Sequence, residues 1–227
     1  TGTVIVIVGL DGSKRMIRYP GANLGLTPND ITNDVMNGVS HVHAALGRIE
    51  IIETAKRIAK SIGLTVSVDG GTPLARKGLD VIKDAINDVD IWFMNSFEAR
   101  ELGRSENVVK AAENIASKVK VRELIVTLGS RGALLLRDGE VKYSDAFKVP
   151  PVDTTGAGDT FAAAYVVASV LDLDPLDKLV FANAAASLKV TKRGARSSPR
   201  LSEVIDFLES LGYAKLANEV LNRLGLS

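Results

Sequence analysis

Apolar and polar positions along this chain follow two alternating patterns. Between residues 39 and 171, short apolar runs of strand length alternate with longer stretches that repeat an apolar residue every three or four positions. Strands that alternate with helices in this way are typical of an α/β protein with a largely parallel sheet. We expect strands at 39–45, 64–69, 90–94, 121–127, 133–137 and 140–143, helices at 49–62, 75–86, 106–117, 161–168 and 177–189, and a last helical region from Pro199.

The first 38 residues have a different pattern. Segments 3–8 and 15–19 are rich in β-forming residues, and the Asp-Gly pair at 11–12 is a turn signal, so the three together predict a β-hairpin. Further along, Thr27 and Pro28 predict the start of a short helix, with Thr27 as its cap.

Composition narrows the class of protein. The chain has 227 residues, of which 46% are hydrophobic and 24% charged, as expected for one globular α/β domain. Its net charge of +1 argues against a nucleic-acid partner, and no apolar run approaches the roughly 20 residues of a membrane span. The absence of cysteine excludes disulfides, thiol catalysis and cysteine-bound zinc, and it fits a reducing compartment, so we expect a cytoplasmic protein.

The most informative stretch is PPVDTTGAGDTF at residues 150–161. Gly156 and Gly158 precede an apolar segment, 161–168, that reads as a buried helix. Glycines at the start of a helix let the backbone approach a ligand, and the N–H groups of the first turn attract anions such as phosphate. We call residues 156–159 the helix mouth.

Asp159 is the unexpected residue of the helix mouth, because a carboxylate repels a resting phosphate. It is explained if Asp159 accepts a proton from a hydroxyl that attacks phosphorus, since phosphoryl transfer needs both N–H donors and such an acceptor. The alternative is that Thr154, Thr155 and Asp159 only cap the helix.

The string DTTGAGDTF at 153–161 resembles the C-terminal signature of the ribokinase-like (PfkB) family of sugar and nucleoside kinases. The resemblance implies a three-layer α/β/α sandwich with a mainly parallel central sheet. In this fold residues 1–20 would form part of a β lid and residues 21–227 the nucleotide-binding and catalytic core.

The same resemblance implies an ATP-dependent enzyme that transfers the γ-phosphoryl group to a hydroxymethyl group of a furanose-type sugar. Asp159 would be its catalytic base. The backbone of Gly156, Ala157 and Gly158 would form the anion hole around the transferred group. A nucleoside or sugar-phosphate kinase of the same family, or a nucleotide-binding or regulatory module without catalysis, remains an alternative.

Three further strings add implied ligands. NSFE at 95–98 resembles an element whose glutamate supports Mg²⁺ through water. The string alone also fits a helix cap with a first-turn acid, but its position at a strand end favours the ligand element. TLGSRGA at 127–133 resembles the nucleotide loop, and VTKRGARSSP at 190–199 resembles half of a K⁺ loop. The implied nucleotide-binding residues are Asn95, Thr127, Gly129, Gly132 and Asn183, and the implied metal ligands are Glu98 for Mg²⁺ and Asp153, Thr155, Val190, Arg193 and Ala195 for K⁺.

Three other polar residues lie on expected strands. His41 and His43 would share one face of a strand, where we expect partly buried structural histidines rather than metal ligands, because no third ligand is evident. Asp69 ends a strand at the edge where parallel sheets bind ligands, so it is a secondary candidate for the site.

The resemblance covers only about the C-terminal two thirds of the family's fold. The opening strands, the sugar-binding aspartate and the Gly-Gly motif are missing, and Ala44 and Ala45 stand about where ribokinases carry a further acid, which puts ribose itself in doubt. We therefore expect the chain to be part of a longer polypeptide, with an unpaired apolar sheet edge beside 64–69 and an open cleft above Asp159. We expect inefficient sugar phosphorylation by these residues alone, and a homodimer formed through the lid.

Overall fold

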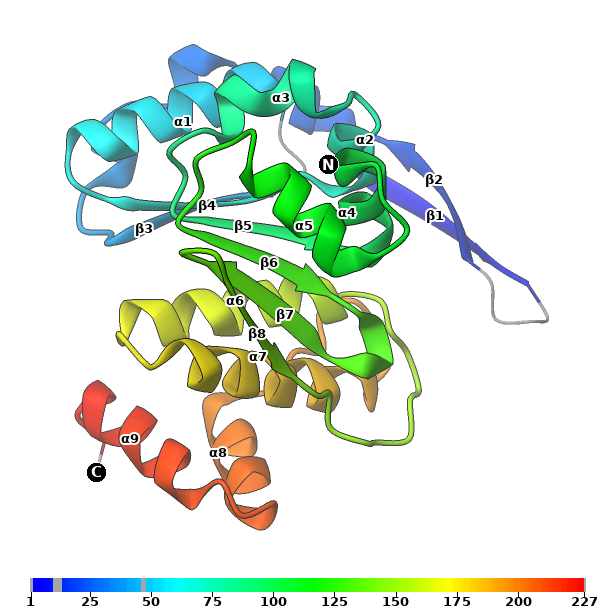
Figure 1. Ribbon diagram of the computed structural model, residues 1–227, viewed down its shortest axis with the longest axis vertical. Coiled ribbons are helices and arrows are strands. Elements are labelled where there is room, and N and C mark those ends of the chain that lie inside the picture. Colours follow the sequence, from blue (N-terminus) through cyan, green and yellow to red (C-terminus); the bar gives the residue numbers. More distant parts are fainter. Residues whose placement is uncertain (1, 10–13, 46–47, 227) are drawn as a thin grey trace.

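The computed structural model describes residues 2–9, 14–45 and 48–226. A six-stranded sheet runs through the molecule and helices cover both of its faces, which confirms the expected α/β/α layers (Figure 1). The sheet order is β3–β4–β5–β6–β7–β8. The strands are β3 (His41–Ala45), β4 (Thr65–Asp69), β5 (Ile91–Asn95), β6 (Glu123–Thr127), β7 (Ala133–Arg137) and β8 (Glu140–Ser144).

The strands from β3 to β6 are parallel, and β7 and β8 complete the sheet in antiparallel pairings. Asn95 stands opposite Thr127 at the carboxyl ends of β5 and β6, and Asp69 ends β4 near the same edge. Because parallel strands present their carboxyl ends on one side, the sheet brings these three candidate residues to a common edge.

The helices form two layers (Figure 1). One face is covered by α1 (Ile49–Ser61), α2 (Gly71–Ala75), α3 (Leu79–Ile86), α4 (Ser96–Gly103) and α5 (Val108–Ala116). The other is covered by α6 (Ala157–Val170) and α7 (Pro175–Val190), with α8 (Leu201–Ser210) packed against α7 and α9 (Ala214–Leu224) against α8.

Alternate residues of each central strand enter different layers of the core. In β5, Trp92 and Met94 pack with the α1–α5 layer, whereas Ile91 and Phe93 pack with the α6–α9 layer. All four side chains are at most 3% exposed. A strand buried on both faces must be apolar throughout, which explains why residues 91–94 form a continuous apolar run.

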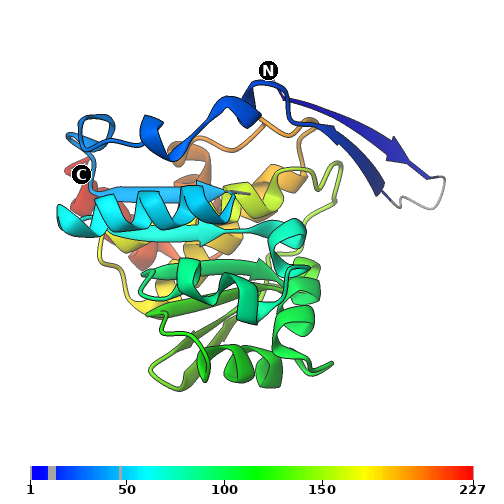
Figure 2. The same ribbon diagram turned by 90° about the horizontal axis from the view of Figure 1, so that it is seen from above.

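The predicted hairpin is present as β1 (Thr3–Val8) and β2 (Lys14–Tyr19), a separate antiparallel pair that projects from the body (Figure 2). Its Asp-Gly turn lies outside the described residues. The hairpin exposes large apolar side chains, including Ile5 at 58% and Ile17 at 57%.

Between β2 and β3 the chain forms short 3₁₀ turns: η1 (Gly21–Gly25), η2 (Pro28–Asp30) and η3 (Asp34–Met36). The short helix predicted at Pro28 is the single turn η2. Thr27 begins it as predicted, since its backbone N–H and its hydroxyl both donate to the Asp30 carboxylate at 2.7 Å.

Three predictions of local structure need correction. The helix expected at 75–86 is broken, because α2 ends at Ala75 and α3 begins only after Gly78, whose φ of +83° lies outside the right-handed helical region. The strand expected from residue 39 begins at His41. The helix α4 is missing from the expected helices, although the helix-cap alternative for NSFE at 95–98 points to its first turn.

Within the described residues β3 is paired only with β4, so the sheet has an edge beside 64–69 as expected. This edge is less apolar than expected, because β3 carries His41 and His43 and its side chains are half-buried or exposed. Asp159 is exposed to solvent. Among the described helices, none combines the length and apolarity needed to cross a membrane.

Candidate functional site

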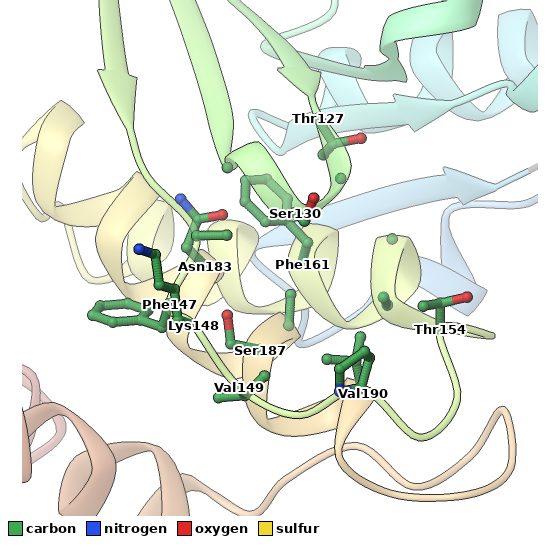
Figure 3. Close-up of a pocket in the computed structure, with 17 residues that line it drawn as sticks. Thr127, Ser130, Phe147, Lys148, Val149, Thr154, Phe161, Asn183, Ser187 and Val190 are labelled. Atoms are coloured by element: carbon green, nitrogen blue, oxygen red, sulfur yellow. The ribbon is translucent and has the colours of Figure 1, made fainter.

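A cavity of about 410 Å³ lies between the loop after β6, the segment that leads from β8 to α6, and the helices α6 and α7 (Figure 3). It is lined by four of the predicted nucleotide-binding residues: Thr127, Gly129, Gly132 and Asn183. Ala157 and Gly158 of the helix mouth line it too. The loop and the helix mouth, both predicted to contact a nucleotide, therefore share one cavity.

The walls of the cavity are mostly apolar. Phe147, Val149, Phe161 and Val190 supply side chains to it, and Lys148 adds a cation (Figure 3). An apolar cleft with a few polar groups is the usual form of a small-molecule site. Sequence patterns did not identify Phe147 or Lys148, because the segment between β8 and α6 has neither helical nor strand periodicity.

Asn183 and Gly132, both predicted to bind the nucleotide, determine the form of the cavity wall. Asn183 is 4% exposed, and its amide nitrogen donates to the carbonyl (3.0 Å) and the hydroxyl (3.2 Å) of Ser144, which ties α7 to the end of β8. Gly132 follows the turn η4 (Gly129–Arg131) with φ +101°. A Cβ there would lie 2.0 Å from the Ser144 carbonyl oxygen, so only glycine fits.

The helix mouth starts at Gly156, which is the N-cap of α6 with φ +83°. An added Cβ would lie 2.5 Å from the Ala195 carbonyl oxygen, so Gly156 permits the close approach of the loop after α7. Gly158 has open space around its Cβ position. The N–H of Ala157 already donates to the Thr154 carbonyl (3.2 Å), so a phosphate would compete with this bond.

Asp159 lies in the first turn of α6, within electrostatic reach of Asp69 at the end of β4. Burial, the nearby Glu98 carboxylate and the Asp159 carboxylate raise the pKa of Asp69 to about 6, against one opposing hydrogen bond from the Gly71 N–H. Two carboxylates, Glu98 and Asp159, therefore act electrostatically on Asp69 at this edge. Such clustering of negative charge is common where a divalent cation or a proton transfer is needed.

Asn95 and Glu98 form a capping box at the start of α4. The Glu98 N–H donates to the Asn95 side chain and the Asn95 N–H donates to the Glu98 carboxylate, both at 3.0 Å. The Thr72 hydroxyl donates to the other carboxylate oxygen at 3.0 Å, and Glu98 is 4% exposed. The helix-cap alternative is therefore present in the structure. Asn95 does not line the cavity. Because both oxygens of the Glu98 carboxylate already accept hydrogen bonds, Glu98 fits a role toward Mg²⁺ only through water.

The residues predicted to hold K⁺ do come together. The Asp153 carboxylate accepts from the Thr155 N–H (2.9 Å) and from the Gly194 N–H (3.0 Å), and the Val190 carbonyl accepts from the N–H groups of Val152 (2.7 Å) and Asp153 (3.0 Å). These bonds join segment 152–155, just before the helix mouth, to the 190–196 loop that follows α7.

This arrangement does not fit K⁺ as predicted. The Val190 carbonyl uses both of its lone pairs on N–H groups. The ammonium of Lys189 also occupies the junction and donates to the carbonyls of Asp153 (3.0 Å) and Lys192 (3.3 Å). Lys189 is fully buried, and sequence patterns placed it only on a helix.

The histidines of β3 form no metal site. His41 Nε2 and His43 Nδ1 lie 2.6 and 2.7 Å from the Ser67 hydroxyl. Burial, followed by the effect of His43, lowers the pKa of His41 to about 4. The structure describes no group of three acidic, histidine or cysteine side chains that could hold a metal ion. The hydrogen bonds to Ser67 fit the interpretation as structural histidines for the half-buried His41, whereas His43 is exposed and not partly buried as expected.

Sequence patterns also did not identify a buried polar cluster around Glu123, between the sheet and the helices α6 and α7. Glu123 is fully buried and binds Lys178 (3.0 Å), Arg137 (3.2 Å) and the Tyr165 hydroxyl (3.0 Å). Burial, followed by the Glu123 carboxylate, raises the pKa of Tyr165. The cluster connects β6 to β7, α6 and α7, and these elements carry the cavity.

Comparison with known proteins adds the family. The model of the pfkB family carbohydrate kinase matches residues 1–201. The chain is 31% identical to a ribokinase of Staphylococcus aureus over 214 residues, which cover 90% of this chain and 68% of that protein. It is 30% identical to an ATP-dependent ribose-1-phosphate kinase of Halopiger xanaduensis, with 92% and 68% covered.

A solved structure has the same fold. The Arabidopsis thaliana ribokinase complexed with ribose and ATP is 28% identical to this chain with a TM-score of 0.79, and the match covers 92% of this chain and 69% of that one. The chain therefore spans just over two thirds of the length of these relatives.

Proposed function

The chain belongs to the pfkB family of carbohydrate kinases, and we propose that it transfers the γ-phosphoryl group of ATP to a hydroxymethyl group of a furanose-type sugar. The observation that carries this proposal is the position of Asp159. It is an exposed carboxylate in the first turn of a helix whose preceding residues line the cavity. Such a residue can accept a proton beside a group that binds phosphate.

In this proposal the nucleotide occupies the cavity. The apolar walls at Phe147 and Val149 suit the base, the backbone around Gly129 and Gly132 suits the ribose and phosphates, and Ala157 and Gly158 receive the γ-phosphoryl group. The partial positive charge of the α6 N-terminus stabilises the negative charge that develops there.

The reaction then needs one proton acceptor. The sugar oxygen attacks the γ-phosphorus and loses its proton to Asp159, while the bond to the bridging oxygen breaks and ADP leaves with those electrons. Mg²⁺ would neutralise charge on the phosphates, and Glu98, through water, and Asp69 are the carboxylates near enough to the mouth to support it. Asp69 remains the secondary candidate.

The phosphoryl acceptor is proposed to be a furanose-type sugar. Ala44 and Ala45 end β3 without a carboxylate, so a nucleoside or a sugar phosphate is the alternative acceptor. The exposed apolar hairpin β1–β2 supports a role as a lid over the sugar, and as a surface for a homodimer. A nucleotide-binding module without catalysis is the candidate from another class.

A coupled ADP-release assay against a panel of pentoses, nucleosides and sugar phosphates tests the proposal. Asp159→Asn keeps the size of the side chain but cannot take the proton, so we expect turnover to fall by at least about 10²-fold while ATP affinity is kept. Asp80→Asn, which changes an exposed first-turn acid of α3, is the matched control. Wild-type turnover in a folded Asp159→Asn variant would exclude Asp159 as the base, and ATP binding without turnover on any acceptor would favour the non-catalytic module.

A further inference from the structure

Lys189 is the one lysine of α7 whose ammonium reaches the segment before the helix mouth. Its side chain is 0% exposed. The ammonium donates to the carbonyl oxygens of Asp153 and Lys192 at 3.0 and 3.3 Å, which come from opposite sides of the junction between segment 152–155 and the 190–196 loop.

The partners of this ammonium are unusual for a buried charge. Both contacts given above for the Lys189 ammonium are to backbone carbonyls, whereas the other buried lysine of α7, Lys178, is paired with the Glu123 carboxylate. Buried charges are costly unless they are paired or coordinated, and these two carbonyls contribute to stabilising the Lys189 ammonium. Carbonyl oxygens are also the ligands that hold a monovalent cation such as K⁺ in proteins.

The junction that Lys189 closes supports the helix mouth directly. Gly156 approaches the Ala195 backbone so closely that no Cβ fits between them. Asp153 binds the N–H groups of Thr155 and Gly194, which fixes the same two segments from the other side. A positive charge at this point lies behind the N-terminal end of α6, where negative charge of a phosphoryl group would be bound.

We propose that the Lys189 ammonium is a built-in cation that holds the helix mouth in its anion-binding form, so that this chain does not need a free monovalent cation. Lys189 is a positioning residue, because it acts through the backbone of segment 152–155 and does not line the cavity. The inference rests on the proposed function for its effect on turnover. Its effect on cation binding does not depend on that function.

The first test measures cation binding through stability. Lys189→Met removes the charge but keeps an unbranched side chain, and it takes the ammonium away from the carbonyls of Asp153 and Lys192. Thermal unfolding is followed as tetramethylammonium is replaced by K⁺ at a constant ionic strength of about 0.2 M, because a ligand that binds only the folded state raises the midpoint. We expect no shift for the wild type, and for Lys189→Met a lower midpoint that K⁺ partly restores.

Lys192→Met is the matched control. It removes a charge from the same loop, but the Lys192 side chain is 36% exposed and pairs with Glu203, while the Lys192 carbonyl stays in place. We expect this variant to respond to K⁺ like the wild type. If Lys189→Met does not fold, two other samples decide the question. One is Lys189→Arg, which retains a cation, and the other is the wild type titrated with K⁺.

The second test measures turnover with the acceptor found in the ADP-release panel. Loss of charge behind the anion hole should lower kcat by roughly tenfold or more and leave KM for the acceptor unchanged, since only the transition state gains from it. K⁺ or methylammonium should restore part of kcat in Lys189→Met. The inference is overturned if the thermal unfolding midpoint or the kcat of the wild type rises with K⁺. It is also overturned if a folded Lys189→Met variant behaves like the wild type in both measurements. Absence of turnover in the wild type would contradict the proposed function and leave the stability test valid.

Discussion

Replacing Gly156 by alanine tests how far the helix mouth depends on the loop behind it. The residue has φ +83°, and its Cβ would lie 2.5 Å from the Ala195 carbonyl oxygen and 3.3 Å from the Ala195 carbonyl carbon. A residue with a Cβ in the left-handed conformation costs about 1–2 kcal/mol. Moving the loop backbone to relieve the overlap adds about 1–3 kcal/mol. We therefore expect the free energy of unfolding to fall by about 2–5 kcal/mol.

Gly158→Ala is the matched variant in the same turn. Apart from its chain neighbours and the backbone of its own helix, its Cβ would have no heavy atom within 4 Å, and its backbone is helical. Alanine should therefore leave the free energy of unfolding unchanged or raise it by about 0.5–1 kcal/mol. The added methyl group would nevertheless enter the cavity where the γ-phosphoryl group is proposed to bind. We expect turnover to fall by about tenfold or more with stability intact.

Urea unfolding followed by circular dichroism, with linear extrapolation, measures the first effect, and ADP release measures the second. A loss below about 1 kcal/mol for Gly156→Ala would show that the loop yields easily and that the close contact is not a constraint. Wild-type turnover in Gly158→Ala would refute the placement of the phosphoryl group at the helix mouth.

The remaining predictions concern buried charge. Lys178→Met should lower the free energy of unfolding by about 3 kcal/mol in urea titrations, because Glu123 stays buried with only Arg137 and Tyr165 as partners. The double variant with Glu123→Leu should recover most of this loss. A loss below about 1 kcal/mol for Lys178→Met alone would contradict this expectation. Because the folded state raises the pKa of Asp69 from 3.8 to about 6, it binds the proton more tightly than the unfolded state, so stability measured with a chelator should decline as pH rises through this interval and then level off. Asp69→Asn should remove that part of the slope, and an unchanged pH profile would count against the perturbed carboxyl.

The sequence by itself determined the elements whose signals are local. The strand at 133–137 and the strand at 3–8 appear with the predicted bounds, and the glycines at 156 and 158 mark the start of α6 as expected. These features depend on side-chain periodicity and on the conformational freedom of glycine, which neighbouring residues reveal. The family resemblance rests on the same short strings.

Only the tertiary structure decided which partners the polar groups have. The Glu98 carboxylate is engaged by Thr72, 26 positions away, as well as by its own helix cap, and the Asn183 amide is engaged by Ser144. No local pattern distinguishes a carboxylate that caps a helix from one that supports a metal, because both require the same residue types at the same spacing.

Lys189 shows the physical reason most clearly. In the sequence it is a polar position near the end of a helix, where a lysine normally extends into solvent. Its burial follows from the packing of α7 against the segment before α6, which brings the carbonyl of Asp153, 36 positions earlier, within hydrogen-bonding distance. Local conformation is encoded in neighbouring residues, but the environment of a charge is set by segments that meet only when the chain folds.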